Sequence, residues 1–162
     1  MKTRELTITA LFVAIGILSA HLIYFPVLVS KCFPVQHAIN VLLTVLLGTR
    51  YAVGASFLTA TMRNLLGTGT LLAYPGSMCG AILSGILYER THSIWGAIVG
   101  EIIGTGIIGA LCAYPFASYI LGSEVGAFFF VVPFMISTVG GSIIAYCLLR
   151  TPIATYFRQH RR

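Results

Sequence analysis

The chain has 162 residues, of which 57% are hydrophobic and 9% charged, and its mean hydropathy is +0.94. A soluble domain carries about a quarter charged residues, so this composition excludes a water-soluble globule and indicates an integral membrane protein. The net charge of +6 is scattered over the ends of apolar segments, which argues against a nucleic-acid-binding surface.

The apolar runs predict an all-α membrane bundle of six transmembrane helices. Their expected bounds, in chain order, are 6–28, 36–48, 50–66, 76–89, 94–120 and 124–149. The charged start followed by an apolar run resembles a signal peptide. The run reaches Val29 without a small-residue cleavage pattern, however, which favours a retained first helix. Residues 1–150 are expected to form one membrane domain, and 151–162 a basic cytoplasmic tail near anionic lipid.

The basic residues predict the orientation in the membrane. With the N-terminus inside, only Lys31 and Arg63 fall toward the outer side. The basic residues that fall inside are Lys2, Arg4, Arg50, Arg90, Arg150, Arg158, Arg161 and Arg162. Because cytoplasmic loops carry an excess of lysine and arginine, both termini are expected in the cytoplasm.

Two of the expected segments, 36–48 and 76–89, are too short to cross a bilayer, which takes about 20 helical residues. Tight charged turns fix their inner ends, so the missing length must lie on the outer side. The connections 29–35 and 67–75 fill it. Short segments interrupted by glycine and proline point to a transporter binding site. The 67–75 connection is therefore predicted to form the wall or lid of an outward-opening pocket.

Several polar residues are expected at the level of this pocket. His37 and Asn40 lie one turn apart near the start of the second segment, although His37 can also be a solvated helix cap. Arg63 lies some 20 Å up the third segment. A cation inside a membrane is costly, which favours a pocket-lining donor beside Asn64 and Thr68. The alternative is an arginine that extends to the outer headgroups.

Glu101 lies about two turns into the fifth segment and has no neighbouring charge in the sequence. Either it packs against a hydroxyl group or it accepts a hydrogen bond from a ligand. Tyr74 precedes Pro75 inside the suspected loop. It is either an interfacial tyrosine or a stacking partner for a small aromatic ring. Ser56 and Thr59 share a helical face with Arg63, so a polar stripe leads up to the loop.

Small residues recur at helical spacing. The two stripes are Gly96, Gly100, Gly104, Gly109, Ala113 and Ala117 in the fifth segment and Gly76, Gly80 and Ser84 in the fourth. Such stripes let helices approach closely in lipid. Ala10 and Ala14 form an AxxxA pattern on the first helix, a smooth groove that can accept the helix of another protein.

The sequence contains no P-loop, no paired acids, no Ser/His/Asp set and no HExxH, which predicts that the chain is not an enzyme and has no catalytic residues or cofactor. The histidines are dispersed, so no metal site is expected. The four cysteines are far apart and are interpreted as small hydrophobic residues.

Four blocks carry a resemblance: KCFPVQHAIN (31–40), RNLLGTG (63–69), AYPGSMCGA (73–81) and GEIIGTGIIGALCAYP (100–115). With six short helices and AxxxA on the first, they resemble the ThiW family, substrate-binding S-components of energy-coupling factor (ECF) vitamin transporters. The resemblance implies uptake of a thiamine precursor, the thiazole moiety hydroxyethylthiazole, across the plasma membrane of a prokaryote. It also implies a transmembrane coupling subunit, contacted by Ala10 and Ala14, and two cytosolic ATPases.

For a thiazole alcohol, the expected contacts are stacking on Tyr74 and hydrogen bonds to Glu101, Asn40 and His37. The lid would hold Arg63, Asn64 and Thr68. Three alternatives remain open: an S-component for another small vitamin, a structural or assembly protein, and a membrane-embedded enzyme using Glu101 and His37. The enzyme is disfavoured because the estimated depths of these two residues place them beyond hydrogen-bond reach.

Overall fold

The computed structural model describes residues 3–27, 30–122 and 126–152. Almost all of the predicted tail, 151–162, therefore lies outside the described residues. The elements, in chain order, are α1 (Thr3–Leu22), β1 (Phe25–Val27), β2 (Ser30–Cys32), α2 (Pro34–Leu46), α3 (Thr49–Leu65), α4 (Ala73–Thr91), α5 (Ile94–Ile103), η1 (Gly104–Gly109), α6 (Ala110–Pro115), η2 (Phe116–Ile120) and α7 (Val131–Leu149).

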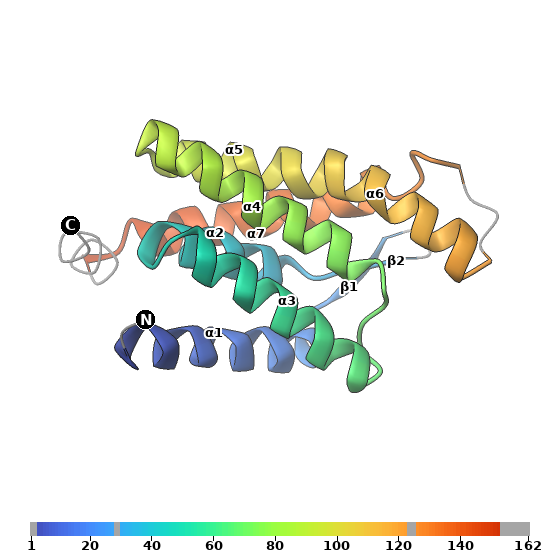
Figure 1. The fold of residues 1–162 in the computed structure, drawn as a ribbon, viewed down its shortest axis with the longest axis horizontal. Coiled ribbons are helices and arrows are strands. Elements are labelled where there is room, and N and C mark those ends of the chain that lie inside the picture. Colours follow the sequence, from blue (N-terminus) through green and yellow to red (C-terminus); the bar gives the residue numbers. More distant parts are fainter. Residues whose placement is uncertain (1–2, 28–29, 123–125, 153–162) are drawn as a thin grey trace.

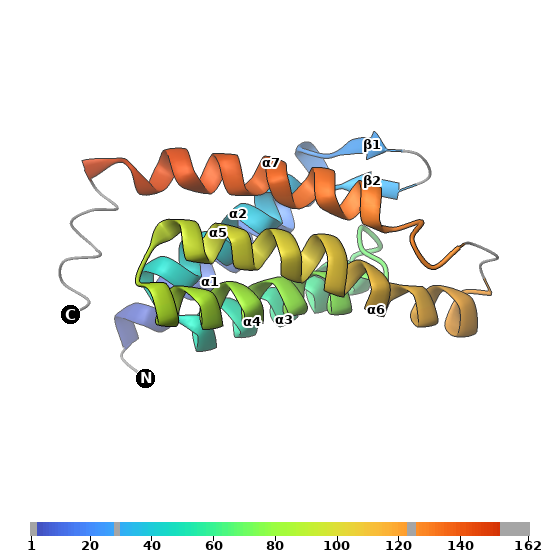
Figure 2. The same ribbon diagram turned by 90° about the horizontal axis from the view of Figure 1, so that it is seen from above.

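Successive helices run in alternating directions between two ends of the bundle (Figure 1). The elements α5, η1, α6 and η2 form one continuous helix from Ile94 to Ile120. The start of α1 and the end of α7 lie together, on the left in Figure 1, and we call this the terminal end. The opposite, hairpin end holds the β1–β2 hairpin and residues 66–72, which connect α3 to α4. In Figure 2, α7 and the hairpin lie on one side of the bundle and α3 and α4 on the other.

Within the described residues, three helices are long and apolar enough to cross a membrane: Thr3–Leu22, Ile94–Ile120 and Val131–Leu149. The shorter α2 is also apolar. The helices α3 and α4 carry more polar residues, and these include buried Ser56, Thr59, Ser77 and Ser84. The mostly helical architecture is as predicted, and six membrane crossings stay a prediction.

The first and last segments were predicted too long. α1 ends at Leu22 and not at residue 28, and the chain then turns into the antiparallel hairpin, in which Phe25 pairs with Cys32. Pro26 explains the early end, because proline removes a backbone donor and pushes the residue before it out of the helical region. At the other end of the chain, α7 begins at Val131 and not at residue 124.

The two short segments have different outcomes. α2 has 13 residues, as predicted. α4 has 19 residues, so the prediction of a short fourth helix is wrong. The helix begins at Ala73 and includes Pro75 in its first turn, where a missing N–H group costs nothing. The connection between α3 and α4 is correspondingly shorter than 67–75.

α2 lies at the centre of the bundle. Eleven of its thirteen residues are buried. Val41 and Leu42 pack in one apolar cluster with residues of α5 and α7, and Leu43 packs in a second with residues of α1 and α3. A helix that is covered on all sides places its polar residues inside protein, and in α2 these are Gln36, His37, Asn40 and Thr44.

The glycine stripes predicted for close packing do bring α4 against the 94–120 helix. A Cβ atom at Gly104 would lie 2.6 Å from the carbonyl oxygen of Cys79, and one at Gly109 would lie 2.8 Å from Cα of Gly76. These contacts leave no room for a side chain. Gly104 and Gly109 are five residues apart, and the π-helical turn η1 spans that interval, which keeps both on the buried face.

Candidate binding cavity

A cavity of about 410 Å³ lies at the hairpin end, among α2, α3, α4, η2, α7 and the 66–72 connection. This volume falls within the range of small-molecule sites, roughly 300–1,000 Å³. Its polar lining includes Lys31, Gln36, His37, Arg63, Thr68, Ser77 and Ser137. Its aromatic lining is Phe33, Phe129, Phe130 and Phe134. An apolar cavity with a few placed polar groups is typical of a ligand site.

The 66–72 connection forms one wall of this cavity. Gly67 adopts a φ of 72°, and the N–H groups of Thr68 and Gly69 both donate to the carbonyl oxygen of Arg63 at 2.9 Å. This left-handed turn caps the end of α3 and folds the chain back over the bundle. The side chain of Asn64 donates to the carbonyl oxygen of Thr70 at 3.1 Å, which holds the wall in place.

Arg63 ties this wall to α2. It is 2% exposed, so an arginine that extends to the headgroups is contradicted. Its Nη1 donates to Oε1 of Gln36, and its Nη2 donates to the carbonyl oxygen of Thr68 at 3.1 Å. The guanidinium carbon lies 3.7 Å from the centre of the Phe33 ring. Stacking on an aromatic face stabilises a partly desolvated cation.

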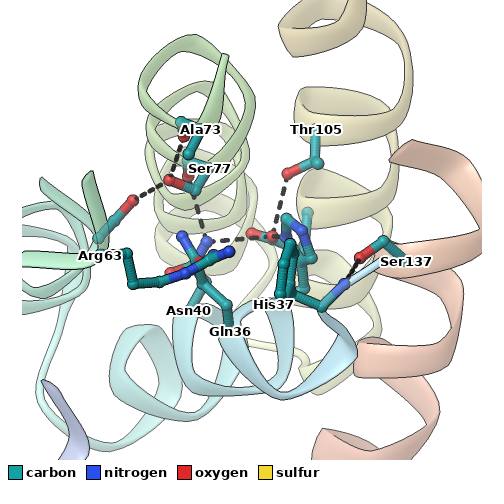
Figure 3. Close-up of polar contacts among 11 residues, drawn as sticks. Gln36, His37, Asn40, Arg63, Ala73, Ser77, Thr105 and Ser137 are labelled. Atoms are coloured by element: carbon teal, nitrogen blue, oxygen red, sulfur yellow. Dashed lines mark hydrogen bonds and ion pairs between the residues drawn. The ribbon is translucent and has the colours of Figure 1, made fainter. Parts of the chain in front are cut away.

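The hairpin is held against α7 at the edge of the cavity. The backbone N–H of Phe33 donates to Oγ of Ser137 at 2.9 Å, a contact that Figure 3 shows. The Cys32 thiol donates to the carbonyl oxygen of Pro133 at 3.2 Å.

Behind the cavity lies a buried polar cluster centred on Glu101 (Figure 3). Nδ1 of His37 lies 2.8 Å from Oε1 of Glu101. The same oxygen accepts hydrogen bonds from Nδ2 of Asn40 at 3.1 Å and from the Thr105 hydroxyl at 3.0 Å. Nδ2 of Asn40 also donates to the carbonyl oxygen of Ser77 at 3.1 Å. The sequence left two interpretations of Glu101, packing against a hydroxyl group and contact with a ligand. The contact with the Thr105 hydroxyl is the first of these.

The expectation that His37 and Glu101 lie beyond hydrogen-bond reach is wrong. His37 lies nine residues before the end of α2, and Glu101 lies seven residues after the start of α5. At 1.5 Å per residue these positions are about 14 Å and about 11 Å above the terminal end. His37 was placed near the outer surface because it begins a helix, but a helix this short begins deep inside the bundle.

The predicted site residues fall into two groups. Three of them line the cavity: His37, Arg63 and Thr68. Asn40 and Glu101 lie behind His37 and are 1% and 0% exposed. Asn64 and Tyr74 do not line the cavity either. The Tyr74 hydroxyl donates to Thr61, and its ring packs on Phe57 with 5.7 Å between ring centres.

The aromatic wall was missed by sequence reasoning. Phe129 and Phe130 meet edge to face with 5.3 Å between ring centres, and Phe134 lies 6.1 Å from Phe130. These residues were assigned to a continuous last helix. The signal that could have found them is the phenylalanine run before Pro133, which marks a helix start and not a helix interior. Among the described residues, no group of histidines, cysteines and acids is arranged to hold a metal ion.

Residues 6–154 match the family model of ThiW, the thiamine-precursor transporter proteins. The chain belongs to the ThiW family. Neither the curated proteins nor the solved structures include a match to it. Membership in ThiW implies a small-molecule substrate, a thiamine precursor, and together with the three long apolar helices it indicates a multi-pass membrane protein.

Proposed function

We propose that this chain is the S-component of an ECF-type importer, and that the cavity at the hairpin end binds the thiazole precursor hydroxyethylthiazole. The observation that carries the proposal is the cavity itself, which joins an aromatic wall to a small set of polar groups. An aromatic ring with one polar arm requires that combination. Scavenging a scarce precursor needs a micromolar or tighter dissociation constant, about −8 kcal/mol.

The charge distribution supports a cavity that faces outward. Arg4, Arg50, Arg90 and Arg150 belong to segment ends at the terminal end, while the cavity is at the hairpin end. The positive-inside rule then assigns the terminal end to the cytoplasm of a prokaryotic cell. In this orientation all six helical segments cross the membrane, with α2 and the hairpin filling one crossing together.

In this proposal the thiazole ring packs against Phe130 and Phe134, and its hydroxyl group reaches His37. In the tautomer with the proton on Nδ1, His37 donates a hydrogen bond from Nδ1 to Glu101. Nε2 is then an acceptor for the ligand. Glu101 and Asn40 then act by orienting His37. Direct contact of the Glu101 carboxylate with the ligand is replaced by this orienting role, because Glu101 and Asn40 are buried behind the imidazole.

ATP hydrolysis is assigned to partners, because the chain contains no P-loop. Ala10 and Ala14 are exposed on α1, whereas Val13 and Gly16 of the same helix are buried against the bundle. A smooth exposed stripe suits close approach of a helix of the coupling subunit. Two cytosolic ATPases would complete the transporter.

Binding of radiolabelled hydroxyethylthiazole to the purified protein tests the proposal, with thiamine and its pyrimidine half as competitors. We expect saturable binding that the pyrimidine does not displace. His37→Ala should weaken binding at least tenfold. The matched control is His21→Ala, because His21 is exposed on α1, where its Nδ1 lies 3.2 Å from the carbonyl oxygen of Ile17. Absence of saturable binding for any thiazole compound would refute the substrate.

The buried His37–Glu101 contact also meets the geometric requirement of a general base, which favours an enzyme as a second candidate. Mass spectrometry of ligand recovered from the protein separates the two functions. An S-component returns the thiazole unchanged, whereas an enzyme returns a product. A different retained vitamin would instead support an S-component of another specificity.

A further inference from the structure

Arg63 is a buried cation that has no acidic partner among the described residues. Its hydrogen-bond acceptors are the amide oxygen of Gln36 and the backbone oxygen of Thr68, both neutral. Its Nε is buried and has no hydrogen-bond partner in the described part of the chain. A guanidinium group presents five donors, so this side chain retains unused donors where it lines the cavity.

The acids that the structure describes do not contact this arginine. The sequence has four acids and no aspartate. Glu5 pairs with Tyr51, Glu89 accepts from Thr49, and Glu101 is engaged by His37, Asn40 and Thr105. The fourth acid, Glu124, lies outside the described residues.

The described lining of the cavity is also positive. It includes Arg63 and, exposed at the mouth, Lys31, and it includes no acidic residue. Lys31 lies over the Tyr24 ring, with 4.6 Å between Nζ and the ring centre. Lining of one sign inside low-dielectric walls concentrates ligands of the opposite sign.

Burial of an ion without a counter-ion is costly, and among the described residues only neutral acceptors and one aromatic face offset part of this cost for Arg63. The cost is recovered if a ligand supplies the negative charge. The planar fork of arginine fits carboxylate and phosphate groups, to which it can donate two parallel hydrogen bonds. Gln36 and Thr68 fix the orientation of that fork before any ligand arrives.

We propose that the ligand of this cavity carries an anionic oxygen group, a phosphate monoester or a carboxylate, which binds the guanidinium group of Arg63. The inference rests on the proposed function and refines it. The thiazole precursor binds in a phosphorylated or carboxylated form more tightly than as the free alcohol. The ring still packs on the phenylalanine wall, while the arm that reaches His37 in the free alcohol carries its anion toward Arg63 and the 66–72 connection.

Competition against radiolabelled ligand on the unmodified protein tests this. The competitors are hydroxyethylthiazole, its phosphate monoester, the matching carboxylate and the neutral dimethyl phosphate ester. We expect at least one anion to bind tenfold or more tightly than both the alcohol and the neutral ester. An alcohol that binds as well as both anions overturns the inference and leaves the thiazole assignment intact. If no thiazole compound binds, the substrate assignment falls, and the inference falls with it.

Variants then assign the anion to Arg63. Arg63→Gln should abolish the preference, so that the anion and the neutral ester bind this variant with affinities within about threefold of each other, while Arg63→Lys should keep part of the preference. The matched control is Arg150→Gln, because Arg150 is exposed at the terminal end and contacts Tyr146. An unchanged preference in folded Arg63→Gln overturns the assignment to Arg63. The comparison of anion with neutral ester on the unmodified protein decides the ligand charge without any variant.

Discussion

Nδ1 of His37 lies 2.8 Å from Oε1 of Glu101, although 64 positions separate the two residues in the chain. The contact joins α2 to the 94–120 helix directly behind the cavity. The imidazole of His37 lines the cavity, whereas the carboxylate of Glu101 does not. The contact therefore lets a buried carboxylate fix the orientation of the imidazole.

Removal of this carboxylate should destabilise the fold. In Glu101→Ala, the donors of His37, Asn40 and Thr105 lose their common acceptor in a buried site, so we expect a loss of about 3 kcal/mol. The readout is thermal unfolding of the detergent-solubilised protein. Glu89→Ala, at an exposed position, is the control and should stay within about 0.5 kcal/mol. Equal effects of the two changes would contradict a structural role for the cluster.

The contact between α4 and the 94–120 helix should not tolerate even one added methyl group. In Gly104→Ala the new Cβ would meet the backbone of Cys79 and Gly80, so the helices must separate and about 2 kcal/mol of stability should be lost. Gly54→Ala is the matched control on α3, because no atom lies within 4 Å of its added Cβ. This control should gain about 0.5–1 kcal/mol from helix propensity. A similar unfolding temperature for both variants would refute the close packing.

The aromatic wall, and not Tyr74, should carry the stacking of the ligand. Phe134→Ala removes a ring that lines the cavity and should weaken thiazole binding at least tenfold. Tyr74→Ala removes a ring that packs on Phe57 outside the cavity lining and should leave the affinity of the folded protein within twofold. Equilibrium binding to both purified variants decides the matter. The reverse order of effects would restore Tyr74 as the stacking residue.

Bulky residues on the exposed face of α1 should separate binding from uptake. In the double variant Ala10→Leu, Ala14→Leu, the stripe loses its smooth surface, so we expect normal ligand binding and at least tenfold slower ATP-driven uptake into proteoliposomes that hold the complete transporter. Val132→Leu, on an exposed position of α7, is the control and should transport normally. Normal uptake by the double variant would move the coupling surface away from α1.

Much of the architecture could be predicted because the signals are local. The 13-residue α2, the buried polar face of α3 and the packing of the glycine stripes all follow from spacing along one helix. The errors in helix bounds arose at prolines, because a proline can either begin a helix or end one. Pro75 was taken to precede α4, yet it lies in the first turn of that helix, and Pro26 ends α1 earlier than hydropathy indicates.

The candidate site was less predictable because its geometry depends on contacts between distant segments. Arg63 and Thr68 were found because a cation and a glycine loop are conspicuous in an apolar chain. The phenylalanine run before Pro133 gives only a weak signal for Phe130 and Phe134, because phenylalanine is also common in membrane helices. Only the relative depth of α2 and α5 brings His37 to Glu101, and sequence periodicity does not encode depth.

The burial of α2 has a consequence for the environment of the protein. Lipid acyl chains reach few of its side chains, since eleven of its thirteen residues are covered by the rest of the bundle. A bilayer that thickens or thins acts on lipid-facing helices, which respond by tilting. The residues beneath the cavity are carried by a helix shielded from that force. The positions of Gln36 and His37, which line the cavity from α2, should therefore change little when the thickness of the bilayer changes.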